Sequence, residues 1–194
     1  MDAQELSPGA LRLLRLVTFA GAVRDAQELV GFQGDFASSI AVLQVGGLVE
    51  TDPVIAPTDA GIETLESWYA ADRRHLREED KSRFLGRFQP LDREVKRLAS
   101  LWQEAVSRDD WDKRLQAVEE LSALHAKAVA LIAEFAPVLP RFVEFSQRLA
   151  LAHEKVLDGE TEFFVAVRCD SYHTIWFQFH EDLLRLLQRE REPE

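Results

Sequence analysis

The sequence predicts a mainly α-helical protein with one small two-stranded hairpin, and three observations support this fold class. Apolar residues recur at helical spacing through most of the 194 residues. Ser, Thr or Asp stands before several of these segments, where its side chain can cap a helix. Two short runs, residues 48–50 and 54–56, have instead the composition of strands and are joined by the turn residues Thr51-Asp52-Pro53.

Composition places the chain among ordinary globular proteins, with 46% hydrophobic and 29% charged residues. Its one cysteine, Cys169, excludes an internal disulfide and fits a reducing cytosol; it is either a reactive thiol or a buried structural residue. The N-terminus has no secretory signal pattern, and no apolar run approaches the roughly 18 residues of a membrane span. We therefore expect a cytoplasmic protein that does not bind a membrane.

The first third of the chain is predicted to contain three helices, the hairpin and a long fourth helix. Ser7-Pro8 places a capping hydroxyl before a proline at the first helical position. Asp35 and Thr58 stand where they would cap the third and fourth helices. The four helices are expected over residues 8–21, 24–30, 36–45 and 59–75.

This order, with Gly47-Leu48-Val49-Glu50 followed by Pro57-Thr58-Asp59-Ala60-Gly61, resembles the wing and the post-wing helix of MarR-type and PadR-type regulators. The resemblance implies a winged helix-turn-helix module, which we expect over residues 1–78. It also implies one candidate function, a ligand-responsive transcriptional regulator.

Charge argues against DNA as the partner of this module. The span from Asp25 to Asp72 contains nine acidic residues and no Lys or Arg. A DNA-binding protein obtains most of its non-specific affinity from cations on phosphate and reads guanine mainly with Arg. The whole chain has a net charge of −11, which also repels nucleic acid. We therefore expect the module to be a protein-docking or dimerisation surface.

Residues 79–194 are predicted to form an antiparallel bundle of amphipathic helices. Helices are expected over residues 81–88 and 90–107, with Pro90 opening the second, then from Asp109 or Asp110 to Phe135, and over residues 142–156. His125 and His153 each stand alone in these helices and are interpreted as structural.

The last helix carries the strongest candidate site. In residues 170–184 two apolar rows lie at helical spacing, and Asp170 is expected to cap the helix. His173 and His180 lie two turns apart on one face, so they are either catalytic groups or hydrogen-bonded core histidines. Their Cα atoms would lie about 10 Å apart, too far to chelate one metal ion, so no metal site is expected. Neighbouring Tyr172, Trp176 and Glu181 are candidate substrate-binding residues.

Several signatures of self-sufficient enzymes are missing from the sequence. It contains no Gly-rich phosphate-binding loop, no Cys-rich zinc pattern, no His-Glu-x-x-His and no Gly-x-Ser-x-Gly. We therefore expect no cofactor to be bound by this chain.

A second resemblance rests on Leu139-Pro140-Arg141-Phe142, Asp158-Gly159, Phe163-Phe164 and the stretch 170–184. These residues resemble a helical module associated with pyruvate phosphate dikinase-like enzymes, and the small subunit of two-component dikinases that phosphorylate hydroxyphenyl ketones such as acetovanillone. The resemblance implies a non-autonomous phosphotransferase subunit that acts on a small aromatic substrate. A large subunit with ATP-grasp and phosphohistidine domains would bind ATP and Mg²⁺. His173 and His180 would then serve as catalytic groups. A plain protein-interaction adaptor remains a third interpretation.

Overall fold

The computed structural model describes residues 5–189 and is mainly helical, with eight α-helices and one two-stranded antiparallel sheet in that range. This confirms the fold class in its general form. The chain divides into two compact units, which we describe separately. Of the described residues, unit 1 contains 5–75 and 181–189, and unit 2 is Leu76–His180.

Unit 1 contains three α-helices, a short 3-10 helix and the hairpin. Their bounds are α1 (Pro8–Ala20), η2 (Ala26–Glu28), α2 (Phe36–Val45), β1 (Val49–Glu50), β2 (Ala56–Pro57) and α3 (Asp59–Arg73). The two strands pair in antiparallel register, with Val49 opposite Pro57 and Glu50 opposite Ala56. Val23 forms an additional bridge with Ile55, so the segment after α1 extends this sheet.

The expected helix caps in unit 1 are confirmed. The side chain of Ser7 accepts from the Ala10 N–H, that of Asp35 from Ser38, and that of Thr58 from Gly61. The helix expected over residues 24–30 is reduced to the three residues of η2. Gly31 and Gly34 follow closely, both with positive φ, and positive φ is incompatible with continuing a helix.

The core of unit 1 is built on the buried side chains of α1. Leu13, Leu14 and Val17 are fully buried, together with Leu43 of α2 and Leu65 of α3. Gly61 allows α3 to approach the hairpin closely. A Cβ at position 61 would lie 2.1 Å from the Leu48 carbonyl oxygen, so any larger residue requires the backbone to shift.

The second domain was expected to run from residue 79 to residue 194, whereas residues 181–189 group with unit 1. Two polar contacts account for this difference. Buried Arg15 of α1 forms an ion pair with fully buried Asp182. Arg73, the last residue of α3, donates to the Arg185 carbonyl oxygen at 2.9 Å. The C-terminal residues thus complete the polar interior of unit 1.

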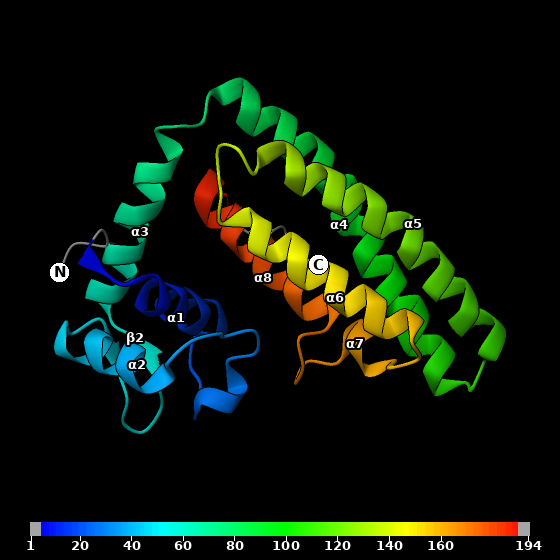
Figure 1. The fold of residues 1–194 in the computed structure, drawn as a ribbon, viewed down its shortest axis with the longest axis horizontal. Coiled ribbons are helices and arrows are strands. Elements are labelled where there is room, and N and C mark those ends of the chain that lie inside the picture. The colour runs from blue at the N-terminus through cyan, green and yellow to red at the C-terminus, as the bar shows by residue number, and fades with distance from the viewer. Residues whose placement is uncertain (1–4, 190–194) are drawn as a thin grey trace. The chain divides into compact units, whose positions relative to one another are not determined.

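Unit 2 contains α4 (Glu78–Ser107), α5 (Trp111–Phe135), α6 (Phe142–Leu157), α7 (Glu162–Val165) and the first nine residues of α8 (Tyr172–Leu187). Figure 1 shows α4, α5 and α6 running side by side. The prediction that Pro90 opens a new helix is wrong, because α4 continues through it. Proline inside a helix costs about 3 kcal/mol. Burial of Phe84, Phe88, Val95 and Leu98 along this one helix offsets that cost.

Aromatic side chains form the centre of unit 2. Phe179 of α8 is completely buried, and its ring lies within 5.2–6.3 Å of five other aromatic rings. These rings belong to Phe84, Phe88, Phe142, Phe145 and Trp176. Most of the pairs are edge-to-face, the arrangement that the ring quadrupoles favour. The prediction that the apolar rows of the last helix are buried is therefore confirmed for Phe179 and Trp176.

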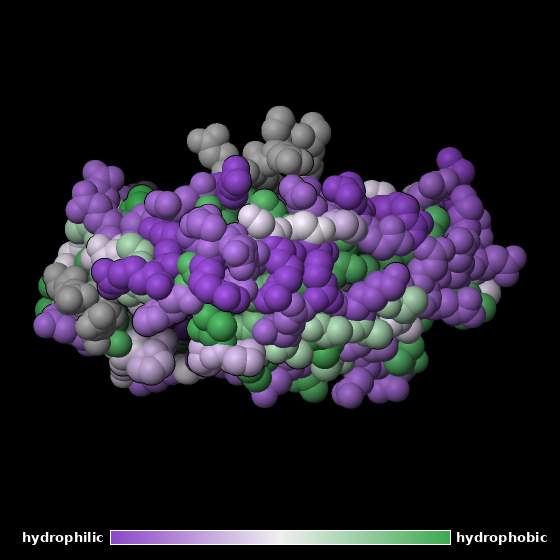
Figure 2. All heavy atoms as spheres, turned by 90° about the horizontal axis from the view of Figure 1, so that it is seen from above, coloured by the Kyte–Doolittle hydropathy of each residue, from purple (hydrophilic) through white to green (hydrophobic). Residues whose placement is uncertain are grey.

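Hydrophilic residues predominate on the face of the molecule that Figure 2 shows, and hydrophobic side chains occur there in small groups. None of the helices in the described part of the chain combines the length and the apolar character needed to cross a bilayer.

Candidate functional site on helix α8

Helix α8 begins at a tightly bonded turn. The hydroxyl of Ser171, which is fully buried, accepts from the Thr174 N–H at 3.2 Å, so Ser171 occupies the capping position. The prediction that Asp170 caps this helix is therefore wrong by one residue. The Thr174 hydroxyl in turn donates to the Ala166 carbonyl oxygen at 3.2 Å, which ties the loop after α7 to the first turn of α8.

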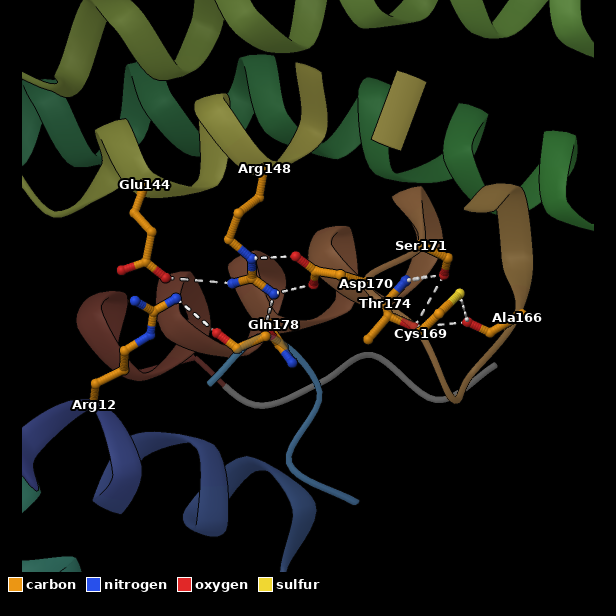
Figure 3. A network of polar contacts seen from close by, with 10 residues as sticks. Arg12, Glu144, Arg148, Ala166, Cys169, Asp170, Ser171, Thr174 and Gln178 are labelled. Carbon is orange, nitrogen blue, oxygen red and sulfur yellow. Dashed lines mark hydrogen bonds and ion pairs between the residues drawn. The ribbon is translucent and has the colours of Figure 1, made fainter. Parts of the chain in front are cut away.

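Asp170 instead pairs with a buried arginine of α6. Arg148 is 4% exposed, and its Nε donates to Asp170 Oδ2 at 2.9 Å. Its Nη2 donates to both Asp170 Oδ1 and Gln178 Oε1, and its Nη1 donates to Glu144 Oε1 at 3.3 Å. Figure 3 shows the guanidinium of Arg148 enclosed by these three side chains. Because the N–H groups of this guanidinium are bonded to side chains of the protein itself, Arg148 fixes α8 against α6.

A second polar group connects α8 with α4. Asp92 is 8% exposed, and its Oδ1 accepts from Trp176 Nε1 at 3.0 Å. The Nδ1 of His180 lies 3.5 Å from the same oxygen, and Lys96 Nζ lies 3.3 Å from the other. We call these four residues the Asp92 site. Phe88, one turn before Asp92, stacks on the Trp176 ring at a centroid distance of 5.4 Å.

The geometry of the Asp92 site resembles that of a carboxylate that orients an imidazole. A carboxylate close to Nδ1 helps to hold the orientation of an imidazole ring. His180 and Asp92 are both largely buried. The arrangement has the chemical elements of a general acid–base.

The five predicted site residues have different environments. Trp176 and His180 meet in the Asp92 site. Tyr172 is buried and faces a different group, described below, and His173 is half-buried one residue further along α8. Glu181 is half-buried and belongs to unit 1, whereas the other four lie in unit 2.

A third polar group contains two histidines whose contact was not expected from their positions in the sequence. The rings of His125 on α5 and His153 on α6 stack with centroids 4.4 Å apart. Tyr172 of α8 lies edge-on to His125 at 5.8 Å, and the Ser122 hydroxyl is 2.9 Å from His153 Nε2. Two buried atoms of this group, His125 Nδ1 and the Tyr172 hydroxyl oxygen, have no hydrogen-bond partner among the described residues.

Burial shifts the pKa values of the two histidines and the tyrosine in this group. Desolvation, assisted by the neighbouring His153, lowers the pKa of His125 from 6.5 to about 4, so the ring is neutral at physiological pH. The pKa of His153 is lowered too, mainly by desolvation. Desolvation raises the pKa of the Tyr172 hydroxyl well above its usual value, so this hydroxyl stays protonated. The two histidines lie on different helices, as expected, and the structure adds that their rings contact each other.

Asp92 was missed by sequence reasoning, although a signal for it exists. It follows Phe88 by one turn and precedes the buried Val95, so it is an acidic residue at a core-facing helix position. Trp176 and His180 are likewise one turn apart, and this i, i+4 pair lies on the face that meets α4. The sequence suggests that His180 pairs with His173, two turns earlier. In the structure His180 instead meets Trp176 and Asp92.

Cys169 is half-buried, and its thiol donates weakly to the carbonyl oxygens of Glu162 and Ala166. Desolvation raises the pKa of this thiol, which disfavours the reactive thiolate. Across residues 5–189, no three His, Cys, Asp or Glu side chains are grouped so that they could hold a metal ion. Comparison of the chain with protein-family models, curated proteins and solved structures gives no match.

Proposed function

We propose that this chain is the small subunit of a two-component, ATP-dependent dikinase that phosphorylates a small hydroxylated aromatic substrate. The observation that carries the proposal is the Asp92 site, in which a largely buried carboxylate lies beside His180. The motif around residues 170–184 supports it, since that stretch resembles the helical module of dikinases. Unit 1 would be a winged-helix module that docks on a protein, and unit 2 an antiparallel helical bundle.

The chemistry required of this subunit is modest. The large subunit, with its ATP-grasp and phosphohistidine domains, would bind ATP and Mg²⁺ and become phosphorylated on a histidine, with consumption of one water molecule and release of AMP and phosphate. The substrate hydroxyl oxygen then attacks phosphorus, the P–N bond breaks, and the hydroxyl proton passes to His180. Phosphoryl transfer depends mainly on positioning and charge stabilisation, which a helical subunit with an oriented imidazole can supply. Asp92 would act as a positioning residue for His180.

Two of the other predicted site residues keep their proposed roles within this scheme. His173, on the same helix, would be a second catalytic group. Trp176 would contact the aromatic substrate, whereas Tyr172 faces His125 and Glu181 belongs to unit 1, so the scheme gives these two no contact with it. Trp176 has the clearest support, since its indole lies in the Asp92 site.

The test is an assay of AMP release by a purified large subunit with and without this chain. We expect substrate-dependent AMP release only when both chains are present. His180→Asn should lower the rate by about a hundredfold or more without dissociating the complex. Asp92→Asn should lower it less and shift its pH profile. His75→Asn, at an exposed histidine of unit 1, serves as the matched control. A large subunit that is equally active alone would refute the proposal.

A MarR-like or PadR-like ligand-responsive regulator is the second candidate, favoured by the element order of unit 1. Helix α2 precedes the hairpin as a recognition helix precedes a wing. Salt-sensitive binding of this chain to duplex DNA upstream of its own gene, with no effect on AMP release, would support this candidate and exclude the first.

A further inference from the structure

Helix α2 has an unusual composition for a helix with an exposed face. Its ten residues, Phe36–Val45, include no charged side chain. One face packs inward through buried Ser39 and Leu43. The exposed side, which we call the α2 face, consists of Ala37, Ser38, Ala41, Val42, Gln44 and Val45.

Val45 is the most prominent residue of the α2 face. It is 87% exposed, and Val42, on the preceding turn, is 39% exposed. The two are followed at once by the Gly46-Gly47 turn, so the apolar surface ends where the chain enters the hairpin. Contiguous exposed apolar side chains rimmed by polar residues mark surfaces that bind another molecule.

Acidic side chains flank the α2 face at both ends. Asp35 caps the N-terminus of α2 and is exposed. At the other end, Gln44 donates to the Thr51 hydroxyl at 2.7 Å, which places the hairpin turn beside the end of the helix. Thr51 lies between exposed Glu50 and Asp52. The sequence has no Lys or Arg between residues 25 and 72.

We infer that the α2 face docks a cationic amphipathic segment of another protein, with apolar side chains over Val42 and Val45 and Lys or Arg toward the flanking carboxylates. The sign of the charge excludes other occupants. Duplex DNA would place its phosphates against Asp35, Glu50 and Asp52. A second copy, docked face to face about a two-fold axis, would bring the same carboxylates together.

This inference deepens the proposed function by naming the surface through which the chain binds a protein partner and the chemistry of that partner. It rests on the proposed function only in that the partner is a protein. The experiment below measures binding and involves no phosphoryl transfer, so a failed AMP assay leaves its result interpretable.

The probe is an amphipathic helical peptide with a leucine face and a lysine face, and its match has glutamate in place of lysine. Binding to the full chain is measured by calorimetry at low and high salt. We expect the lysine peptide to bind at least about tenfold more tightly than the glutamate peptide, a difference of about 1.4 kcal/mol. Higher salt should weaken its binding.

Substitutions separate docking on the α2 face from simple charge attraction. Val45→Asp adds a negative charge, so pure attraction would strengthen lysine-peptide binding. Docking on the apolar face should instead weaken it about fivefold or more, as expected for a loss of about 1 kcal/mol. Glu50→Lys should weaken binding as well. Asp158→Lys, at an exposed acid in unit 2, is the matched control and should change little.

Three results would overturn the inference. They are equal affinity for the two peptides, stronger binding by Val45→Asp, and duplex DNA binding that Val45→Asp abolishes. Sedimentation of the peptide-free chain tests the remaining occupant. A dimer that Val45→Asp dissociates would assign the α2 face to a second copy. Because Val45 is 87% exposed, this variant should retain the wild-type circular dichroism spectrum.

Discussion

The stacked histidines of unit 2 should make the protein less stable in mild acid. The pKa of His125 is lowered from 6.5 to about 4 in the folded chain. The unfolded chain therefore binds more protons between about pH 6.5 and pH 4, and stability falls as the pH decreases through this range. Protonating His125 in the folded state would place a charge directly against the His153 ring, 4.4 Å away.

The size of this effect follows from the shift. A displacement from 6.5 to about 4 corresponds to about 3 kcal/mol, at about 1.36 kcal/mol for each pKa unit. The His125 side chain is partly exposed, so solvent screening reduces the expected loss to about 1–2 kcal/mol. The lowered pKa of His153 adds to the loss in the same direction.

Urea denaturation from about pH 7 to about pH 4.5, followed by circular dichroism, measures this loss. Carboxylates elsewhere also titrate at the acid end, so the informative quantity is the difference between wild type and His125→Gln. We expect the variant to lose about 1–2 kcal/mol less than wild type over this range. His75→Gln controls for the removal of a histidine. Parallel pH profiles for wild type and His125→Gln, or an imidazole of His125 that titrates near 6.5 by NMR, would refute the reasoning.

Four further substitutions test the packing around α8, within unit 1 and on α4, each by urea denaturation at neutral pH. Arg148→Met should cost about 3 kcal/mol, because it leaves the Asp170 carboxylate without its buried partner; an unchanged midpoint would show that the ion pair contributes nothing net. Trp176→Phe should cost about 1–3 kcal/mol, since it removes the indole donor to a buried carboxylate on α4. Gly61→Ala should destabilise by about 2 kcal/mol through its clash with the hairpin carbonyl. Gly86→Ala, in open space within α4, should stabilise by about 0.5–1 kcal/mol, and a result of the opposite sign at either glycine would contradict the packing.

Local signals were sufficient to predict much of the fold. The caps at Ser7, Asp35 and Thr58 and the hairpin between α2 and α3 follow from short-range chemistry, because each depends on residues within a few positions. Pro90 shows where such rules fail. Its local cost favours a break, but burial along both halves of α4 keeps the helix continuous, and burial is a property of tertiary packing.

The polar groups around α8 depend on residues far apart in sequence, so spacing could not pair them. His125 and His153 lie on different helices, and only the packing of α5 against α6 brings their rings together. Asp92 and His180 are similarly separated. The residue types on α8 predicted that a polar site would be there, but the partners on other helices came only from the structure.

The pairing of Arg15 with Asp182 has a consequence for how the protein is made. Unit 1 is discontinuous in sequence, because it combines residues 5–75 with residues 181–189. Arg15 can therefore pair with Asp182 only after the C-terminal segment has been made. On the ribosome the N-terminal module would emerge before Asp182, so the ion pair between Arg15 and Asp182 can form only when nearly the whole chain has been synthesised. A fragment ending after α3 would lack this ion pair. The order of synthesis therefore makes this contact a late, long-range event in folding.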